Sequence, residues 1–240
     1  MKISVLIIAH NEEKYIAKCI ESILHQSRKA DEIVLIAHNS TDKTVDIATK
    51  YPFVRVVEYN GPAGQPYARM KGFEEISGDY ICSIDGDAYA NKHWINRIVT
   101  PLYKNADISI VGGRVSMNNN WLLKLGMLIQ FVWRRKLIKD PLAQFASGAN
   151  WACRLEDYKK VGGLEPVLKL IPDLELYFPA EDFYISQALR TIGKLHIVLN
   201  AVVNTNFSPE QSSLKAQMEL IPKWAHDNQA ILDYFKNKKI

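Results

Sequence analysis

Residues 3–9, ISVLIIA, form an unbroken apolar run that is typical of a β-strand covered on both faces. The residues after it favour a helix, because Asn11 is a suitable N-cap and apolar side chains then recur on one helical face. The same order recurs twice, as EIVLIA (32–37) before NSTDKTVDIATKY (39–51) and FVRVVEY (53–59) before YARMKGFEEI (67–76). A fourth strand, DYICSI (79–84), follows. In the second helical stretch Ser40 or Thr41 is the predicted N-cap. Strands alternating with helices predict an α/β fold with a parallel, doubly wound sheet.

Polar residues follow three of these predicted strands. They are His10, Asn11 and Glu12 after the first, His38 and Asn39 after the second, and Asp85, Gly86 and Asp87 after the fourth. Ligands of doubly wound sheets bind beyond the carboxyl ends of the strands. The sequence therefore places its candidate site at this edge.

The stretch ICSIDGDAYA (81–90) runs an apolar strand into two acids with one glycine between them. On a strand end, Asp85 and Asp87 would point to the same side, and Gly86 would permit a sharp turn. Converging carboxylates repel each other unless a cation joins them, and oxygen ligands favour Mg²⁺ or Mn²⁺ with positions left for phosphate oxygens. The alternative is a polar turn that ends the strand. A calcium loop is excluded, because the next residues lack the further acids and the glycine that it needs.

Composition limits the remaining classes of function. The chain has 240 residues, 48% of them hydrophobic, which is enough for the core of one large domain or two small ones. Its net charge of +4 is spread along the sequence and does not favour nucleic-acid binding. Cys19, Cys82 and Cys153 are far apart, which predicts free thiols in a reducing compartment. The first apolar run is too short for a signal peptide, so the expected location is the cytoplasm.

Five stretches resemble, in order, the successive motifs of the family 2 glycosyltransferases, over about residues 3–200. They are VLIIAHNEEKYIAKCIESIL, HNSTDKTVDIA, ARMKGFEEISGDYICSIDGDA, SGANWACRLEDYKKVGGL and AEDFYISQALRTIG. The resemblance implies a GT-A fold and transfer of a sugar from a nucleotide sugar, usually a UDP-sugar, to an acceptor hydroxyl. It also implies inversion at the anomeric carbon and a divalent metal, Mn²⁺ or Mg²⁺.

We expect one GT-A domain over residues 1–240, although the tail from Ser208 matches no motif of the family. A nucleotide-sugar-binding half would cover about residues 1–110 and an acceptor-side half about residues 111–207. Residues 208–240 would form a C-terminal helical tail.

The donor site follows by position. Asp85 and Asp87 match the DxD element of the family, in which Asp87 would bind the metal that bridges the diphosphate, and Asp85 the ribose or the waters of the metal. The metal would act as a Lewis acid on the leaving diphosphate. Arg69 matches a basic residue near the base or the diphosphate, although a solvated helix charge is the alternative. The nucleotide-sugar-binding residues implied in this way are Ala9, His10, Asn11, Glu12, His38, Asn39, Arg69, Asp85 and Gly86.

Three positions depart from the family pattern. His10 stands where an aromatic residue is frequent, His38 where an acid usually reads the nucleobase, and Met70 where asparagine is common. Histidine can donate or accept a hydrogen bond but cannot reproduce the paired acceptance of a carboxylate, so the choice of uridine stays open. Either histidine could instead be a partly buried polar residue.

The acceptor side is implied by two later motifs. SGANWACR (147–154) resembles the strand that lines the acceptor pocket, with Gly148 giving access to the backbone and Asn150 or Trp151 facing a sugar; the alternative for Trp151 is a core position. Glu181 and Asp182 match the ED element, whose acid deprotonates the acceptor hydroxyl. We expect Asp182 to be this base, with Glu181 second. The alternative explanation is that both acids stabilise a helix N-terminus.

The stretch WLLKLGMLIQFVWRRKLIK (121–139) concentrates apolar and basic residues. It is too short to span a bilayer, but it could lie on a membrane surface with Arg134, Arg135 and Lys136 facing anionic lipid. A core helix with a charged end is the alternative. Membrane contact would place the protein peripherally on the inner face of the membrane and would suit a lipid-linked acceptor; a glycan is the other acceptor class. No multiple transmembrane helices and no QxxRW-type element follow, which favours transfer of a single sugar.

Two other functions share this layout. A sugar nucleotidyltransferase would need a glycine-rich loop after the first strand, and IIAHNEE (7–13) contains no glycine. A catalytically degenerate sugar- or nucleotide-binding module is the other alternative, suggested by the histidines at nucleotide positions. The presence of Asp85, Asp87 and Asp182 argues against it.

Overall fold

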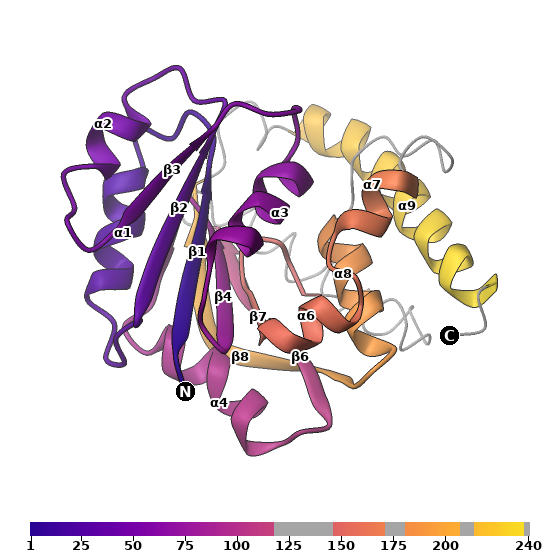
Figure 1. The fold of residues 1–240 in the computed structure, drawn as a ribbon. Coiled ribbons are helices and arrows are strands. Elements are labelled where there is room, and N and C mark those ends of the chain that lie inside the picture. Colours follow the sequence, from indigo (N-terminus) through magenta and orange to yellow (C-terminus); the bar gives the residue numbers. More distant parts are fainter. Residues whose placement is uncertain (118–145, 171–180, 207–213, 238–240) are drawn as a thin grey trace.

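A central sheet with helices on both faces organises the protein (Figure 1). The computed structural model describes residues 1–117, 146–170, 181–206 and 214–237. Within these residues the sheet has eight strands in the order β3-β2-β1-β4-β7-β6-β8-β5. The strands are β1 (Ile3–Ala9), β2 (Glu32–His38), β3 (Arg55–Tyr59), β4 (Tyr80–Asp85), β5 (Ala88–Ala90), β6 (Ile108–Met117), β7 (Trp151–Arg154) and β8 (Lys194–Thr205).

The first four strands are parallel and end at one edge. Ile8 of β1 pairs with Ile36 of β2 and with Asp85 of β4, so the polar residues that follow these strands meet there. Further along, β7 lies antiparallel between β4 and β6, β6 and β8 are parallel, and β5 is antiparallel to β8. The prediction of a mostly parallel α/β sheet is confirmed.

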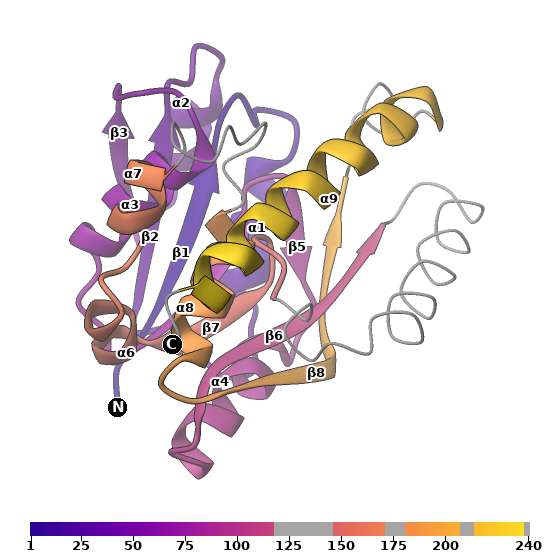
Figure 2. The same cartoon turned by 90° about the vertical axis from the view of Figure 1, so that its right-hand side faces the viewer.

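Helices cover both faces of the sheet. Those with described bounds are α1 (Ile16–Leu24), α2 (Thr44–Ala48), α3 (Gln65–Glu75), α4 (Trp94–Lys104), α6 (Leu155–Lys160), α7 (Glu165–Leu170), α8 (Glu181–Arg190) and α9 (Leu214–Asn237). Core residues of α1, α2 and α4 share one face of the sheet, and those of α3, α6 and α8 share the other. Helix α9 contacts α8 on the outside of this second layer and extends beyond it (Figure 2).

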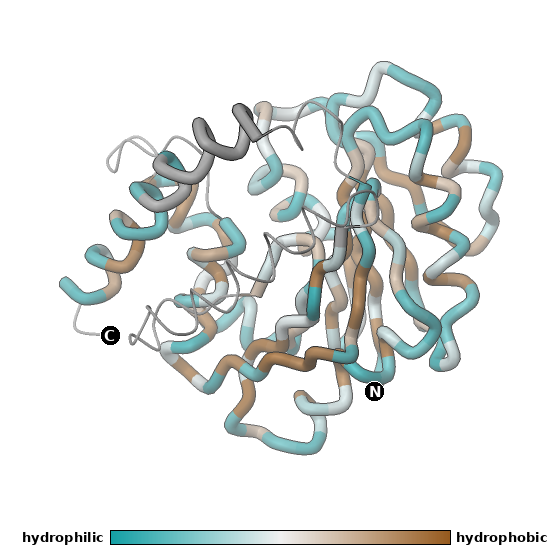
Figure 3. The backbone as a smooth tube through the Cα atoms, turned by 180° about the vertical axis from the view of Figure 1, so that it is seen from behind, coloured by the Kyte–Doolittle hydropathy of each residue, from teal (hydrophilic) through white to brown (hydrophobic). Residues whose placement is uncertain are grey.

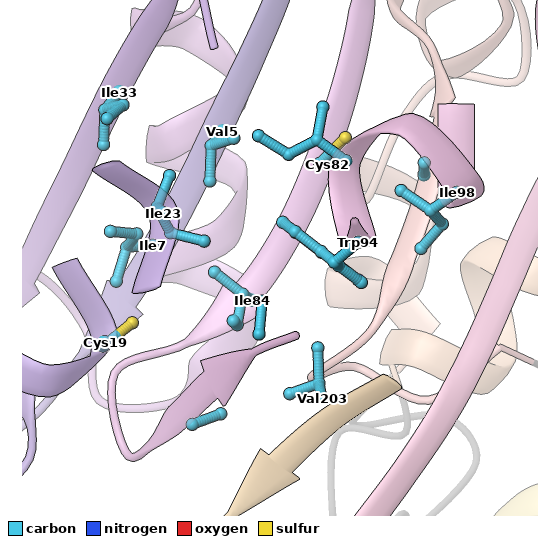
Figure 4. Close-up of a cluster of buried hydrophobic side chains, with 14 of the residues drawn as sticks. Val5, Ile7, Cys19, Ile23, Ile33, Cys82, Ile84, Trp94, Ile98 and Val203 are labelled. Carbon is cyan, nitrogen blue, oxygen red and sulfur yellow. The ribbon is translucent and has the colours of Figure 1, made fainter. Parts of the chain in front are cut away.

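Alternation within β1 explains why its sequence is apolar throughout. Val5 and Ile7 pack into the cluster on the α1 and α4 face (Figure 4), whereas Leu6 and Ile8 pack into the cluster on the α3 and α8 face. Each such buried side chain contributes about 1.5–3 kcal/mol of hydrophobic stabilisation. The three cysteines are buried and unpaired, as predicted.

Apolar segments concentrate on the strands of the sheet, and the outer loops are hydrophilic (Figure 3). Among the described residues, no helix has both the length and the hydropathy to cross a membrane. The stretch 121–139 lies outside the described residues, so its membrane contact stays a prediction.

Two predicted helix starts are wrong in detail. Helix α1 begins at Ile16 and not after Asn11, whose φ of 56° is left-handed and whose Oδ1 accepts a hydrogen bond from the Thr41 backbone N–H (2.8 Å). Helix α2 begins at Thr44, later than a cap at Ser40 or Thr41 would give. Asn11 therefore joins the turns after β1 and β2 instead of capping a helix.

Candidate active site

The turns after β1 and β2 support each other. Asn11 and Asn39, at φ of 56° and 48°, both adopt the left-handed conformation that asparagine tolerates better than most residues. His10 Nδ1 donates to the His38 carbonyl oxygen (2.7 Å), and Asn39 Nδ2 donates to the Gly61 carbonyl oxygen (3.1 Å). These bonds fix His10, Asn11 and Asn39 at the edge predicted for the nucleotide.

The two predicted histidines differ in exposure. His10 is exposed, whereas the side chain of His38 is buried, with its ring 5.5 Å from the Tyr59 ring and its Nε2 2.9 Å from the Pro62 carbonyl oxygen. In this structure the His38 ring contacts protein groups and does not open to the edge. The structure therefore offers His10, and not His38, to a ligand.

The turn after β4 brings three carboxylates together. Gly86 donates to the Ile8 carbonyl oxygen (2.7 Å), and a Cβ at this position would lie 2.9 Å from Ala9 Cβ and 3.2 Å from Glu12 Cγ. Only glycine permits this approach, which places Glu12 beside the acids. Burial, then Asp87 and Asp85, raise the pKa of Glu12 to about 8.

Asp87 does not belong to the strand that carries Asp85. Because β4 ends at Asp85, the alternation argument does not extend to Asp87, which lies in the turn toward β5. Its Oδ2 accepts from Thr205 Oγ1 (2.8 Å), and its carbonyl oxygen accepts from the Asn206 backbone N–H (3.3 Å). Burial, then the charge of Asp85, raise the pKa of Asp87 to about 6.

These carboxylates fit a divalent cation. Within the described residues, no three His, Cys, Asp or Glu side chains lie close enough to hold a metal ion by themselves. Carboxylate oxygens of Asp85 and Asp87 are hard ligands, and a cation between them would offset both the burial and the repulsion by Asp85 that raise the pKa of Asp87. The residues therefore suit Mg²⁺ or Mn²⁺ that takes its other ligands from phosphate oxygens and water.

Arg69 is the centre of the second part of the site. Its side chain on α3 is fully buried, so the alternative of a solvated charge is wrong. Nη1 donates to Ser83 Oγ (2.5 Å) and to the Gly148 carbonyl oxygen (3.0 Å), and Nη2 donates to Asp85 Oδ1 (3.1 Å). Sequence reasoning missed Ser83, although a serine two residues before Asp85 in an apolar strand must share its face.

Glu181 and Asp182 open helix α8 on the far side of Arg69. Asp182 accepts hydrogen bonds from the Gly148 backbone N–H (Oδ2, 3.0 Å) and the Phe183 backbone N–H (Oδ1, 2.7 Å). Glu181 is buried, with Oε1 3.6 Å from Arg69 Nε. Burial raises the pKa of both acids; the charge of Arg69 opposes the rise for Glu181, and the two backbone donors oppose it for Asp182.

Two of the three predicted acceptor residues lie in the core. The Asn150 side chain is fully buried, and it accepts from Trp94 Nε1 (2.8 Å) and donates to the Arg114 and Ala201 carbonyl oxygens (3.0 Å each). Trp151 is 1% exposed and stacks on Phe73. In this structure neither side chain can face a sugar, which corrects that expectation. Of the three, only Gly148 lies at the acids.

Comparisons with a family model and with curated proteins both find glycosyltransferases. Residues 4–162 match the model of the family described as Glycosyl transferase family 2. A probable glycosyltransferase of Bacillus subtilis, YdaM, is 27% identical over 99% of this chain, which spans 59% of the length of that protein. An uncharacterised glycosyltransferase of Haemophilus influenzae is 32% identical over 46% of this chain and 35% of its own length.

Solved structures share the fold. TarS of S. aureus superposes with a TM-score of 0.63 at 18% identity, over 86% of this chain and 60% of that one. Glucosyl-3-phosphoglycerate synthase of Mycobacterium tuberculosis, in complex with Mn²⁺, UDP and glucosyl-3-phosphoglycerate, gives a TM-score of 0.61 at 20% identity over 98% of this chain and 79% of that one. At these identities the likeness establishes the GT-A fold alone. The family model matches residues 4–162, which are more than half of this chain. The chain therefore belongs to the family 2 glycosyltransferases.

Proposed function

We propose that the protein transfers one sugar from a UDP-sugar to an acceptor hydroxyl with inversion at the anomeric carbon. The observation that carries this proposal is the chain of contacts Asp85–Arg69–Gly148–Asp182, which joins an acid of the candidate donor site to a candidate base. Structures of the same fold support the donor class, since the M. tuberculosis synthase was solved with Mn²⁺ and UDP-glucose, and TarS with UDP.

On the donor side, Asp87 would bind the divalent cation, and Asp85 would contact its waters or the ribose. When bound, the cation supplies positive charge to the leaving diphosphate. Thr205 orients the carboxylate of Asp87 through its Oδ2, and Gly86 keeps Glu12 against the same cluster. The exposed His10 would lie nearest to the nucleotide.

On the acceptor side, the contacts favour Asp182 over Glu181 as the general base. Asp182 is partly exposed and its orientation is fixed by two backbone N–H groups, whereas Glu181 is buried beside Arg69. An inverting transfer needs one carboxylate within hydrogen-bond reach of the acceptor hydroxyl. The acceptor would be a glycan or a lipid-linked sugar.

A calorimetric titration tests the donor assignment. UDP, GDP and CDP would each be titrated with and without Mn²⁺ into the wild type, Asp87→Ala and the control Asp46→Ala, which removes an exposed acid of α2. We expect Mn²⁺-dependent binding of UDP that is at least about 10-fold weaker in Asp87→Ala and unchanged in Asp46→Ala.

Failure of every nucleotide to bind would refute the donor site. The catalytically degenerate binding module, which the buried ring of His38 favours, would then become the better explanation.

A further inference from the structure

Arg69 connects three separate segments of the chain. Its guanidinium bonds Ser83 and Asp85 on β4, bonds the carbonyl oxygen of Gly148 in the turn before β7, and lies against Glu181 at the start of α8. The side chain has no exposed surface. A fully buried arginine in such a position can contact a nucleotide only if its surroundings move, which does not suit the direct nucleotide contact that its sequence position implies.

One hydrogen bond is missing from the network around Arg69, and a short movement of its guanidinium would form it. Within the described part of the chain, Arg69 Nε has no hydrogen-bond partner, and it lies 3.6 Å from Glu181 Oε1. Hydrogen bonds between such groups are 2.7–2.9 Å long, so a movement of less than about 1 Å would form one. A buried charged donor without a hydrogen-bond partner is energetically unfavourable, so movement of the guanidinium toward Glu181 would be favourable.

Gly148 is the link between Arg69 and Asp182. Its carbonyl oxygen accepts from Arg69, its N–H donates to Asp182, and a Cβ here would lie 3.1 Å from Arg69 Nη2 and 3.6 Å from Asp182 Oδ2. The guanidinium is planar and rigid, so a shift at Nη2 also shifts Nη1 and Nε. Any change in how strongly Asp85 holds Nη2 therefore reaches Gly148 and Glu181 together.

We propose that Arg69 is a positioning residue that transmits occupancy of the donor edge to Asp182. When a cation and diphosphate interact with the Asp85 carboxylate, the hydrogen bond from Arg69 Nη2 to Asp85 weakens. Arg69 then moves toward Glu181, and the Gly148 turn, which is bonded to Nη1, moves with it. Donor binding thereby sets the position of the acceptor-side acid. This inference rests on the proposed function. By thermodynamic linkage, binding of the acceptor must change the affinity for the donor by the same factor as binding of the donor changes the affinity for the acceptor.

Glycine signals in a ¹⁵N NMR spectrum report both ends of this path. The chain has 12 glycines, and Asp precedes only Gly86, so ¹³C-carbonyl labelling of Asp identifies its signal. Ser precedes Gly78 and Gly148, and replacing Ser77 by Thr distinguishes them. Gly86 lies between the donor-side acids, and Gly148 donates to Asp182.

The experiment adds UDP with Mg²⁺ to the wild type, to Arg69→Lys and to the control Arg55→Lys, whose arginine pairs with Glu75 and Glu32 at the surface. We expect both signals to shift in the wild type and in Arg55→Lys. In Arg69→Lys the Gly86 shift should persist and the Gly148 shift should fall by at least about half, because an ammonium cannot hold Asp85 and Gly148 in one rigid fork.

Three outcomes would overturn the proposal: a Gly148 shift of full size in Arg69→Lys, a wild type in which only Gly86 shifts, or a folded Arg69→Lys that no longer binds UDP. The last would make Arg69 a direct nucleotide ligand. If Arg69→Lys does not fold, Ser83→Ala, which removes one acceptor of Nη1, carries the same expectation. If neither signal of the wild type shifts, the proposed donor function itself fails.

Discussion

Burial raises the pKa of acids at the proposed donor edge and on the proposed acceptor side alike, but the groups that surround the two sets of acids differ. At the donor edge, burial and then the charges of Asp87 and Asp85 raise the pKa of Glu12, and burial and then the charge of Asp85 raise the pKa of Asp87. On the acceptor side, Glu181 has the cation of Arg69, and Asp182 has two backbone donors. In the proposed function, the protein itself therefore orients the acids of the acceptor side, whereas a cation bound from outside would offset the charge of the donor edge.

Arg69 explains why the two regions are not independent. The guanidinium of Arg69 forms ion pairs with both Asp85 and Glu181. A bound cation that neutralises Asp85 would therefore change the ion pair between Arg69 and Glu181. Removing one partner of a buried ion pair is costly, because it leaves the other charge uncompensated. Variants that act on one region alone are the sharpest tests of the comparison.

The largest effect should follow Asp182→Asn. The amide cannot accept a proton from an acceptor hydroxyl, so we expect the rate of UDP release in the transfer reaction to fall about 10²- to 10⁴-fold, with UDP affinity retained. The control is Asp46→Asn on the exposed side of α2. A rate within about threefold of the wild type would remove Asp182 from catalysis and turn attention to Glu181.

Asn150→Leu tests whether the core position of Asn150 is structural. The substitution leaves Trp94 Nε1 and the carbonyl oxygens of Arg114 and Ala201 without their partner. At about 1 kcal/mol or more for each group, we expect the free energy of unfolding to fall by about 3 kcal/mol and Tm by about 6–12 °C.

The matched control for this change is Asn96→Leu, on the exposed face of α4, which should be nearly neutral. UDP affinity of folded Asn150→Leu should equal that of the wild type. Weakened acceptor binding at unchanged stability would restore the sequence-based assignment of Asn150 to the acceptor site.

The sequence predicts those parts of the molecule that depend on local pattern. Apolar runs such as 3–9 and 32–37 identify strands buried on both faces, and polar residues after them identify the edge where Asp85 lies. Burial of His38 and Trp151 depends on partners distant in sequence, which neither residue type reveals. The resemblance to a family placed all of these residues at a site without distinguishing exposed from buried side chains.

Long-range pairing accounts for what was missed. Thr205 reaches Asp87 because β5 pairs with β8, with Ala88 opposite Thr205, and no local pattern predicts that register. Arg69 was found by its position in the helix motif, but its contact with Gly148 spans 79 residues of sequence. The sequence alone therefore located the acids and did not reveal how they are connected.

Thr205→Val tests the support of Asp87. Valine has nearly the same shape but donates no hydrogen bond to Oδ2, which leaves the carboxylate less well oriented and further raises the pKa of Asp87. Partners of metal ligands typically contribute 10- to 100-fold to metal affinity, so we expect Kd for Mn²⁺ in the presence of UDP to rise by about 10-fold. Thr100→Val, at the partly exposed Thr100 of α4, is the control. An unchanged Kd would show that Thr205 does not support the metal site.

The smallest effect concerns Glu12 and the pH dependence of stability. Because the pKa of Glu12 is about 8 in the folded protein and 4.5 in the unfolded chain, the folded state binds more protons between these values. The free energy of unfolding without a divalent ion should therefore fall as pH rises from about 5 to 8. Glu12→Gln removes this loss. Solvent screening of the partly exposed side chain limits the gain to about 1 kcal/mol at pH 8, or about 2–4 °C in Tm.

The dependence of Tm on pH and on metal shows whether Glu12→Gln acts through charge repulsion or through side-chain packing. At pH 4.5 the wild type and Glu12→Gln should have similar Tm values, since Glu12 is then largely protonated in the folded protein. Mg²⁺ with UDP at pH 8 should raise Tm of the wild type more than Tm of the variant, because the cation offsets a charge that only the wild type carries. If Glu12→Gln raised Tm by the same amount at pH 4.5 and at pH 8, charge repulsion would not destabilise the donor edge. The contrast with the acceptor side would then disappear.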